Sequence, residues 1–584
     1  MTPQPAIGIA WNPRGAGNTV IRAGFSLRRF TEPQQYFWNQ ASDYGAVYFQ
    51  SFAANANNTG APGTFAPGSV SWQGCSTGNG ECSGPNPLSY LPSGYFYAPT
   101  QYQKAYNFSD FTFQTGPGIN GVEGNIRQPY TESWNFGVQH QFGDSRALEI
   151  RYIGNRSLRQ WISINPNEIN IFENGFLTEF KAAQQNLAIN NASGNANFAG
   201  SFANNGLAGQ SALPIMSTAF AGEPTGPDGN LQDFTNGTFD FLLQTGQAGS
   251  FAGQLAGIGN ADYLCNLVQA GSFAPCANIG YSGSGGPYPV NFFQANPFAQ
   301  GLGESELVAK GYSNYNGLQL DFRQRAWHGL QFDANYTWSH TLGISTQNNW
   351  QGAITAFTLR NMRLSYGPTL FDIRHSVHIS GTYDLPFGKG KQFLSNSALD
   401  RVVGGWTIGT IITLQSGNPF PLQGGYNTFN DYADGGVVLN GVTVSQLQSS
   451  VGVYRIAGQP AVDFINPKYL QNNGTGGGAN TTFITPNTTP GTIGQIVWLH
   501  GPHFINDDMS LTKHIRLTER LNLSLQAEAL NAFNHPSFQP GSGSGCSYFC
   551  YGMGVGIQNG NFGIGGTSPS YQPRVLELRG NIEF

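Results

Sequence analysis

Six cysteines are the first residues whose spacing suggests chemistry. They form three close pairs: Cys75 with Cys82, Cys265 with Cys276, and Cys546 with Cys550. All three pairs lie in expected loops, and pairs this close predict local disulfides in an oxidising, extracytoplasmic setting. Metal binding is the competing interpretation, but no CxxC spacing and no flanking histidine supports it.

Other candidate motifs for catalysis or metal binding are weak. Gly74–Gly78 matches the G-x-S-x-G nucleophile elbow, but it lies in a Gly/Ser/Cys loop without the required strand and helix. His375 and His378 face opposite sides of an expected strand, so they do not chelate one ion. The loop sequence His500-Gly501-Pro502-His503 has the residue types for a metal site, but neither an HExxH nor a Walker-type motif occurs. The sequence therefore predicts no catalytic residue, no cofactor and no metal site.

The elements that position the side chains are best seen in the last ten residues. Leu576, Leu578, Ile582 and Phe584 lie on one side, with Gly580 between them, and Val575, Glu577, Arg579, Asn581 and Glu583 lie on the other. A period of two over this length is typical of a membrane-spanning β-strand. The apolar series Leu578, Ile582 and terminal Phe584 resembles the closing strand of a bacterial outer-membrane β-barrel, and this resemblance implies a barrel-assembly signal.

The same alternation recurs along the chain. Strands are expected at 4–12, 18–30, 131–142, 145–155, 314–326, 329–341, 374–385, 402–415, 508–517, 519–533 and the final segment. Strands of roughly ten to thirteen residues that often end in an aromatic favour a membrane barrel with aromatic girdles over a soluble sandwich, whose strands usually have about five or six residues. We therefore predict an all-β, antiparallel transmembrane barrel of about eleven strands.

Short and long connections between these strands alternate. The long ones are expected at about 31–130, 156–313, 342–373, 416–507 and 534–570, and within the longest we expect a short amphipathic helix at 176–190. Outer-membrane barrels alternate short periplasmic turns with long extracellular loops in this way. The long loops are therefore expected outside the cell.

An odd number of strands suggests part of a larger barrel. Single-chain bacterial barrels have even strand numbers, and eleven is half of the 22 strands of plugged outer-membrane transporters. Met1-Thr2-Pro3 begins no signal-peptide pattern. We expect residues 1–584 to be the C-terminal portion of a barrel domain that is missing its plug and signal peptide.

Several short motifs resemble TonB-dependent receptors of the Oar-like type. They occur at residues 6–13, 18–25, 127–135, 152–155, 314–319, 336–340 and 529–535 and so extend over the whole chain. The resemblance implies an outer-membrane location, contact with lipid and with the barrel-assembly machinery, and a TonB complex that acts only through the missing plug. It names no ligand.

The composition of the chain argues against two classes of protein. Charged residues make up 10% of the chain, the net charge is −5 without a basic cluster, and no apolar run is long enough for a helical span, so nucleic-acid binding and helical membrane crossing are not expected. The mean hydropathy of −0.27 agrees with the expectation that no helix of the chain crosses a membrane. Charges on the polar strand faces are expected to face the barrel interior, because placing them in lipid is costly: Arg22, Glu149, Arg151, Asp321, Arg323, Asp333, Glu528, Glu577, Arg579 and Glu583.

Aromatic residues beside Asn and Asp in the loops suggest contact with a polar organic ligand. The segments are 36–38, 95–97 and 426–432, and packing of the loops on themselves is the alternative. We expect a non-enzymatic outer-membrane transporter for an unidentified small molecule, such as a carbohydrate or a chelate. A surface adhesion protein and a passive porin are the alternatives, and neither requires the plug and TonB-contacting segment that energised uptake needs.

Overall fold

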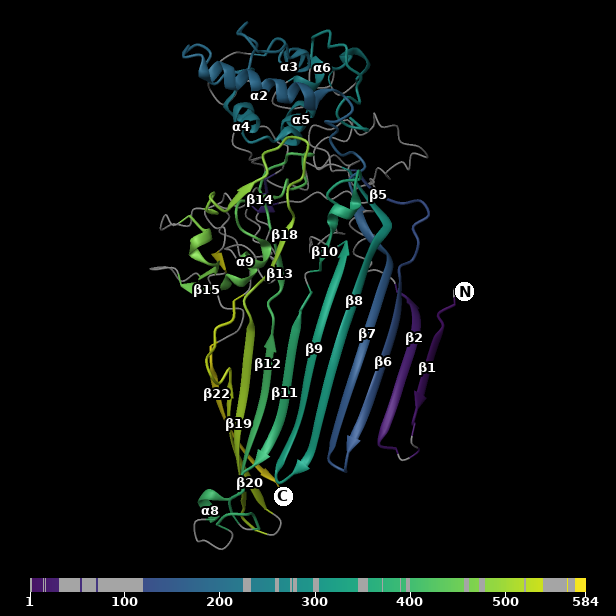
Figure 1. Ribbon diagram of the computed structural model, residues 1–584, viewed down its shortest axis with the longest axis vertical. Helices are drawn as coiled ribbons and strands as arrows, with labels where there is room; N and C mark the ends of the chain where they lie inside the picture. The colour runs from purple at the N-terminus through teal and green to yellow at the C-terminus, as the bar shows by residue number, and fades with distance from the viewer. Residues whose placement is uncertain are drawn as a thin grey trace.

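One curved antiparallel sheet dominates the computed structural model of the chain (Figure 1). The structure describes the short strands at 53–54, 70–71 and 564–565 and, apart from short gaps, residues 3–30, 119–223, 233–257, 262–297, 304–344, 356–394, 400–455, 462–471, 478–518, 521–538 and 573–583. Neighbours in the sheet follow the chain order, so the expected up-and-down antiparallel topology is confirmed.

Eleven strands form the main path of this sheet within the described residues. They are β1 (Ala6–Trp11), β2 (Thr19–Arg29), β6 (Tyr130–Phe142), β7 (Arg146–Ile164), β8 (Glu304–Trp327), β9 (Leu330–Ile344), β11 (His375–Asp384), β12 (Trp406–Gln415), β19 (Phe504–Arg516), β20 (Asn522–Leu530) and β22 (Val575–Glu583). Two short strands attach at the side: β10 (Tyr366–Pro368) pairs with β9, and β5 (Ile119–Val122) pairs with β8 in parallel.

The strand register gives the sheet one apolar and one polar face. Directly opposed residues in antiparallel strands point to the same side, and one such row contains Ile9, Ala23, Phe136, Tyr152, Leu318 and Trp338. A second row, from Ile408 through Leu511 and Ala527 to Leu578, continues this face across the C-terminal strands. Many of these large apolar side chains are exposed, and Leu578 retains 86% of its accessible surface. Such a face requires an apolar environment.

Strands β7 and β8 are longer than the alternation predicts. The expected ends at 155 and 314 are wrong, since β7 continues to Ile164 and β8 begins at Glu304. Trp161 and Ile162 are neighbours in sequence and both are buried, so both faces of the strand are covered there. A strand buried on both faces loses the alternation by which it is recognised. The pair therefore rises beyond the rest of the sheet (Figure 1).

The short turns all lie at one end of the sheet, which we call the turn end, and the long connections lie at the loop end. His328 and Gly329 join β8 to β9 with φ of 49° and 85°. Two successive positive φ values define a type I′ turn, whose twist matches that of a tight hairpin. The link between β11 and β12 is longer and contains α8 (Asp400–Val403).

The longest connection folds into a helical cap at the loop end. We use this name for the described residues between 165 and 297, which contain α2 (Phe176–Ala192), α3 (Pro214–Ala219), α4 (Gly237–Gln244), α5 (Ala248–Ala256), α6 (Tyr263–Leu267) and a 3₁₀ turn at Ala270–Ser272. The expected amphipathic helix at 176–190 is confirmed. Its Phe176 and Phe180 are fully buried and contact Phe251 of α5. The cap thus has an aromatic core of its own.

A second loop unit, residues 416–503, packs beside the cap. It contains β13 (Pro419–Leu422), β14 (Val437–Leu439), α9 (Val444–Ser449), β15 (Val451–Arg455), β16 (Val462–Ile465), a 3₁₀ turn at Pro467–Tyr469, β17 (Ile484–Pro486) and β18 (Val497–His500). Phe420, Phe464 and Leu499 belong to its buried core. Remaining elements are a 3₁₀ turn at Met362–Ser365, the pair β3 (Ala53–Ala54) and β4 (Val70–Ser71), and β21 (Ile564–Gly565), which pairs with β16.

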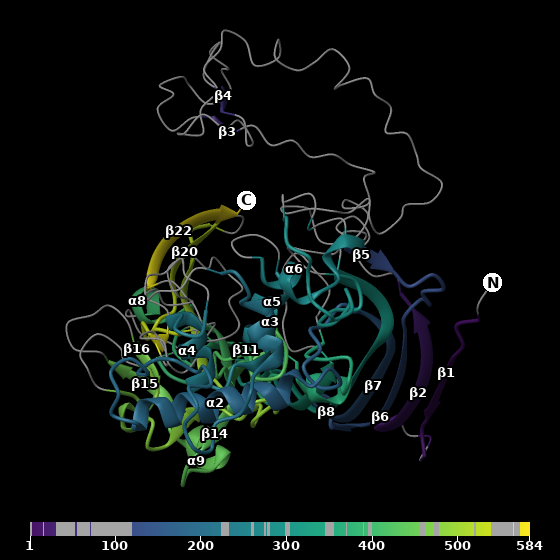
Figure 2. The same ribbon diagram turned by 90° about the horizontal axis from the view of Figure 1, so that it is seen from above.

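The sheet curves into an open arc. Seen from above, it encloses a space over which α2, α3 and α5 project (Figure 2). Within the described strands, β1 and β22 end the path and do not pair with each other. In the described part of the chain, no helix combines the length and the apolar character needed to cross a bilayer.

Candidate functional site

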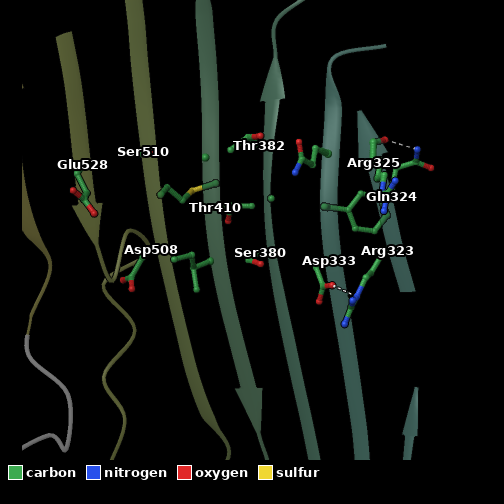
Figure 3. A pocket seen from close by; sticks show the side chains of 16 residues that line it. Arg323, Gln324, Arg325, Asp333, Ser380, Thr382, Thr410, Asp508, Ser510 and Glu528 are labelled. Carbon is green, nitrogen blue, oxygen red and sulfur yellow. Dashed lines mark hydrogen bonds and ion pairs between the residues drawn. The ribbon is translucent and has the colours of Figure 1, made fainter. Parts of the chain in front are cut away.

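A hollow on the polar face of the sheet is the candidate site. It has a volume of about 520 Å³ and is lined by residues from β8, β9, β11, β12, β19 and β20 (Figure 3). Ser380, Thr382 and Ser510 line it with hydroxyl groups, and Gly409 adds no side chain at its base. A Cβ atom at Gly409 would lie 2.5 Å from the Ser510 hydroxyl oxygen. Small and polar residues therefore keep this part of the wall open.

The hollow carries charges of opposite sign on its two sides. Arg323 and Arg325 lie on β8 beside a single carboxylate, Asp333 of β9, whereas Asp508 and Glu528 lie on β19 and β20. In the register, Arg323 opposes Asp333, and the same row continues through Ser380 and Ile411 to Asp508. A dipolar solute fits such a wall better than a singly charged one, because each of its ends meets the opposite charge.

Several of the polar-face charges are already paired, either within one strand or between neighbouring strands. The Arg323 Nε atom lies 2.8 Å from Asp321 and 3.0 Å from Asp333. The register also places two pairs of carboxylates directly opposite each other, Glu149 with Asp321 and Glu528 with Glu577. Like charges in opposed positions repel, and the nearby arginines offset this repulsion.

The same pairing recurs at other arginines of the polar face. Arg579 contacts Glu577 at 2.7 Å and Glu528 at 3.5 Å, and Arg151 contacts Glu149 at 3.9 Å. Arg22 donates to Gln139 at 2.8 Å. Of the expected interior charges, only the Glu583 side chain lies outside the described residues. A wall with paired charges is wettable without holding one ion tightly, which suits a path more than a high-affinity site.

Contacts between the loops and the wall gather at Asp372, which is fully buried between β10 and β11. Its carboxylate accepts hydrogen bonds from the Thr341 backbone N–H at 2.7 Å and from Arg374 Nε at 3.0 Å. His340 Nδ1 lies 3.1 Å away, and His500 Nε2 of the second loop unit lies 3.3 Å away. Asp372 thus connects β9, β11 and β18 in one cluster, which we call the Asp372 clasp.

The clasp favours the ionised form of its carboxyl group. Burial opposes ionisation, but the hydrogen bonds from His500, the Thr341 N–H and His340, together with the charge of Arg374, outweigh it, so the pKa of Asp372 lies below its ordinary value. The carboxylate is therefore charged at neutral pH and holds the second loop unit against the wall.

A second set of contacts joins the cap to both neighbouring loops. Glu168 accepts from Thr358 Oγ1 at 2.7 Å and from Asn430 Nδ2 at 2.9 Å. At Gly249 of α5, an added Cβ would lie 2.0 Å from the Asn430 carbonyl oxygen. Arg360 pairs with Glu173 and lies over the Phe172 ring. Close backbone packing and a shared carboxylate therefore join the long connections into one assembly.

The aromatic residues of 426–432 were expected either to form a ligand surface or to pack against other loops. In the structure they pack against the cap. Tyr426 contacts Phe241 of α4, with ring centroids 6.1 Å apart. Burial raises the pKa of Asp431 beside them. The aromatic segments 36–38 and 95–97 lie outside the described residues.

The structure describes one of the three cysteine pairs and part of the expected barrel-assembly signal. Cys265 and Cys276 form a disulfide within the cap, with Cα atoms 5.7 Å apart. Leu578 and Ile582 lie on the apolar face of β22 and are exposed. The remaining expected site residues, namely Cys75, Cys82, Cys546, Cys550 and Phe584, lie outside the described residues, as does the motif at 74–78.

The histidines form no metal centre among the described residues, where no group of three His, Cys, Asp or Glu side chains could hold an ion. His375 opposes Trp338 and His378 opposes Asn335, so the two point to opposite faces as expected. His500 contacts Asp372 instead. Sequence reasoning missed the clasp, because its members are separated by up to 160 residues and share no motif.

Known proteins similar to this chain come from the outer membrane. The family model described as "Outer membrane beta barrel domain" matches residues 1–576. No curated protein sequence matches the chain. Solved structures similar to it include the outer membrane transporter YddB from Escherichia coli, with 6% identity, a TM-score of 0.36, and coverage of 99% of this chain and 40% of that chain.

Two further structures have the same level of similarity. A mutant of the ferric enterobactin receptor PfeA from Pseudomonas aeruginosa has 8% identity, a TM-score of 0.32, and coverage of 99% and 40%. The FrpB iron transporter from Neisseria meningitidis has 9% identity, a TM-score of 0.32, and coverage of 99% and 39%. The chain thus spans about two fifths of the length of these structures. Because the family model matches nearly the whole sequence, the chain belongs to the outer membrane β-barrel domain family.

Proposed function

We propose that this chain forms the C-terminal part of the barrel of a TonB-dependent outer-membrane transporter. The observation that supports it most is the polar wall with paired charges beneath a folded cap. A wettable wall passes polar solutes, and a cap with its own core restricts access from the loop end. In the proposed orientation the cap and the second loop unit are extracellular, and the turn end faces the periplasm.

The rest of the transporter would come from a segment upstream of this chain. A plug inside the barrel would contact TonB and receive energy from the inner membrane, and the wall described above would guide the solute around it. The opposite charges of Arg325 and Asp508 on the two sides of the hollow favour a small polar nutrient, such as a carbohydrate or a chelate with separated charges. We also propose that Leu578, Ile582 and Phe584 form the signal for the barrel-assembly machinery. The cysteine pairs 75/82 and 546/550 would be loop disulfides.

Uptake by cells that make the native protein tests this function. The probes are a fluorescent oligosaccharide and a ferric hydroxamate chelate, each measured with and without a protonophore. Uptake of one probe that stops with the protonophore supports energised transport. Protonophore-insensitive uptake of both would indicate a porin, and cell attachment without uptake would indicate an adhesion protein; either result overturns the proposal.

Two neighbouring residues offer a matched pair of variants. Ser380 lines the hollow, whereas Ile379 follows the apolar row on the opposite face of β11. Ser380→Trp should slow uptake because the indole fills the path, whereas Ile379→Trp should leave uptake unchanged because its ring points toward lipid. Equal effects of the two variants would show that the polar face does not line the route.

A further inference from the structure

Lys513 lies on the apolar face of the sheet, where a charge is not expected. It alternates with Leu511 and Ile515 along β19, and it opposes Trp406 and Leu525 on the neighbouring strands. An exposed ammonium group on a lipid face is costly at the bilayer midplane and less costly near the interface. Lys513 is nevertheless only 7% exposed.

The link between β11 and β12 covers this ammonium group. Lys513 Nζ donates to the carbonyl oxygen of Val402 at 3.2 Å and to that of Gly404, and it lies 5.3 Å from the centre of the Trp406 ring. Trp406 Nε1 donates to the same Val402 oxygen at 2.8 Å. These contacts fix α8 against the apolar face at the turn end (Figure 1).

Three large apolar side chains of this link are exposed, beside the polar Lys391 and Gln392. Phe393, Leu394 and Val402 retain 49%, 44% and 67% of their accessible surface. A tight turn, in which the Gly388 N–H donates to the Phe393 carbonyl oxygen, holds the Phe387 and Phe393 rings 5.9 Å apart. Leu394 has φ of 55°, a conformation that β-carbon-bearing residues other than Asn and Asp rarely adopt.

We propose that the described residues 385–394 and 400–405, which we call the foot, insert into the headgroup–acyl boundary of the outer-membrane leaflet at the turn end, with phospholipid as the occupant. The apolar surface of the foot is continuous with the lipid-facing row at Trp406, Ile408 and Leu511, so the same bilayer that covers this row reaches the foot. Lys391 pairs with Asp384 at 3.4 Å, so its charge is offset and the apolar side chains carry the argument for lipid contact. The inference rests on the membership in the barrel family and not on the transport function.

Two consequences follow from this position. The foot shields Lys513 from the acyl chains, and it enlarges the apolar contact of the sheet at its margin. Interfacial binding of this kind scales with the buried apolar area. Loss of Val402 should therefore weaken lipid contact without changing the polar face.

Site-specific fluorescence in vesicles tests the proposal. The native protein carrying Val402→Cys is labelled with an environment-sensitive dye under non-reducing conditions. It is placed in phosphatidylethanolamine–phosphatidylglycerol vesicles with a spin-labelled lipid that quenches at the headgroup boundary. Ser380→Cys in the hollow is the matched control, and the protein without an added cysteine gives the background.

We expect blue-shifted emission and several-fold stronger quenching at Val402 than at Ser380. Equal quenching at the two positions would overturn the proposal, since the foot would then lie in water. A blue shift at Val402 that disappears when each vesicle contains one protein molecule would also overturn the proposal, because a second copy of the chain would then be what shields the dye from water. Folding of each variant is judged by the altered migration of the folded barrel on gels run without heating. If the Val402→Cys variant does not fold, Phe393→Cys repeats the test.

Discussion

Replacement of Asp372 by asparagine should release the second loop unit from the wall. The variant keeps the size of the side chain but removes its charge and turns an NH₂ group toward donors at Thr341, Arg374 and His500. The carboxylate is fully buried, whereas the side chains of Arg374 and His340 are 33% and 29% exposed and regain water when the clasp breaks. Loss of one partner of a buried ion pair costs about 3–5 kcal/mol, and the exposure of the partners lowers our expectation to about 2–3 kcal/mol.

Hydrogen exchange measures this loss at the pair of strands that the clasp supports. In the native protein the Phe420 and Leu499 amides belong to the β13–β18 pair. A loss of about 2–3 kcal/mol in opening free energy speeds their exchange roughly 30- to 150-fold, given about 1.4 kcal/mol per tenfold. His500→Ala removes one hydrogen bond, so we expect about 1 kcal/mol and roughly a fivefold change.

Two controls separate the clasp from general destabilisation. Amides of α2 should keep their exchange rates in Asp372→Asn, because the cap has its own core. Asp384→Asn removes an exposed carboxylate whose contact with Lys391 is 3.4 Å long, and it should leave β13–β18 unchanged. Unchanged exchange at Phe420 and Leu499 in Asp372→Asn would refute the role of the clasp.

The pH dependence of the clasp has a definite sign. The pKa of Asp372 is lowered on folding, so its contribution is fully present above the ordinary aspartate value of about 3.9. It is lost only as the pH falls through the lower, folded-state value. Exchange at β13–β18 should therefore be insensitive to this group at neutral pH and should accelerate beyond the intrinsic rate only in strong acid.

Three further predictions concern the loops and the wall. Burial raises the pKa of Asp463 to about 6, so the β15–β16 pair should gain stability as the pH falls from neutral toward 5. Asp463→Asn should abolish this trend in hydrogen exchange, and a trend that persists would assign it to another group. Phe251→Ala in the cap core should cost about 3–5 kcal/mol and expose the cap to limited proteolysis with the sheet intact. The half-exposed Phe241 serves as the control, and equal cleavage of the two variants would contradict a packed core. Arg323→Gln leaves Asp321 and Asp333 unpaired in the wall. In planar bilayers it should shift any ion flow toward cations, and an unchanged reversal potential would place these residues away from the path.

The sequence predicted the sheet well because its two faces meet different environments. Alternation at positions such as Leu576 and Glu577 reports which side faces lipid and which faces the interior, and this information is local. Where the two faces become equally buried, as at Trp161 and Ile162, the signal disappears although the strand continues. Local patterning therefore found the barrel wall and lost the extensions of β7 and β8.

The cap and the clasp were beyond this kind of inference for a different reason. Apart from the helix expected at 176–190, the region 165–297 has low periodicity, and its phenylalanines are spread over several helices that bury them only in combination. The clasp joins His340, Asp372 and His500 through the topology of the sheet. Neither feature is encoded at a fixed spacing, so both required the three-dimensional arrangement.

Two solvents stabilise different parts of this chain. The sheet exposes Leu578 and Leu511 and relies on lipid to cover them, whereas the cap encloses Phe176 and Phe251 and relies on water to drive their burial. The clasp joins the wall to the second loop unit and is built from buried polar contacts, which depend little on apolar burial but strongly on correct pairing. It requires both the wall and the second loop unit to be in place, so it is the contact that reports their correct assembly.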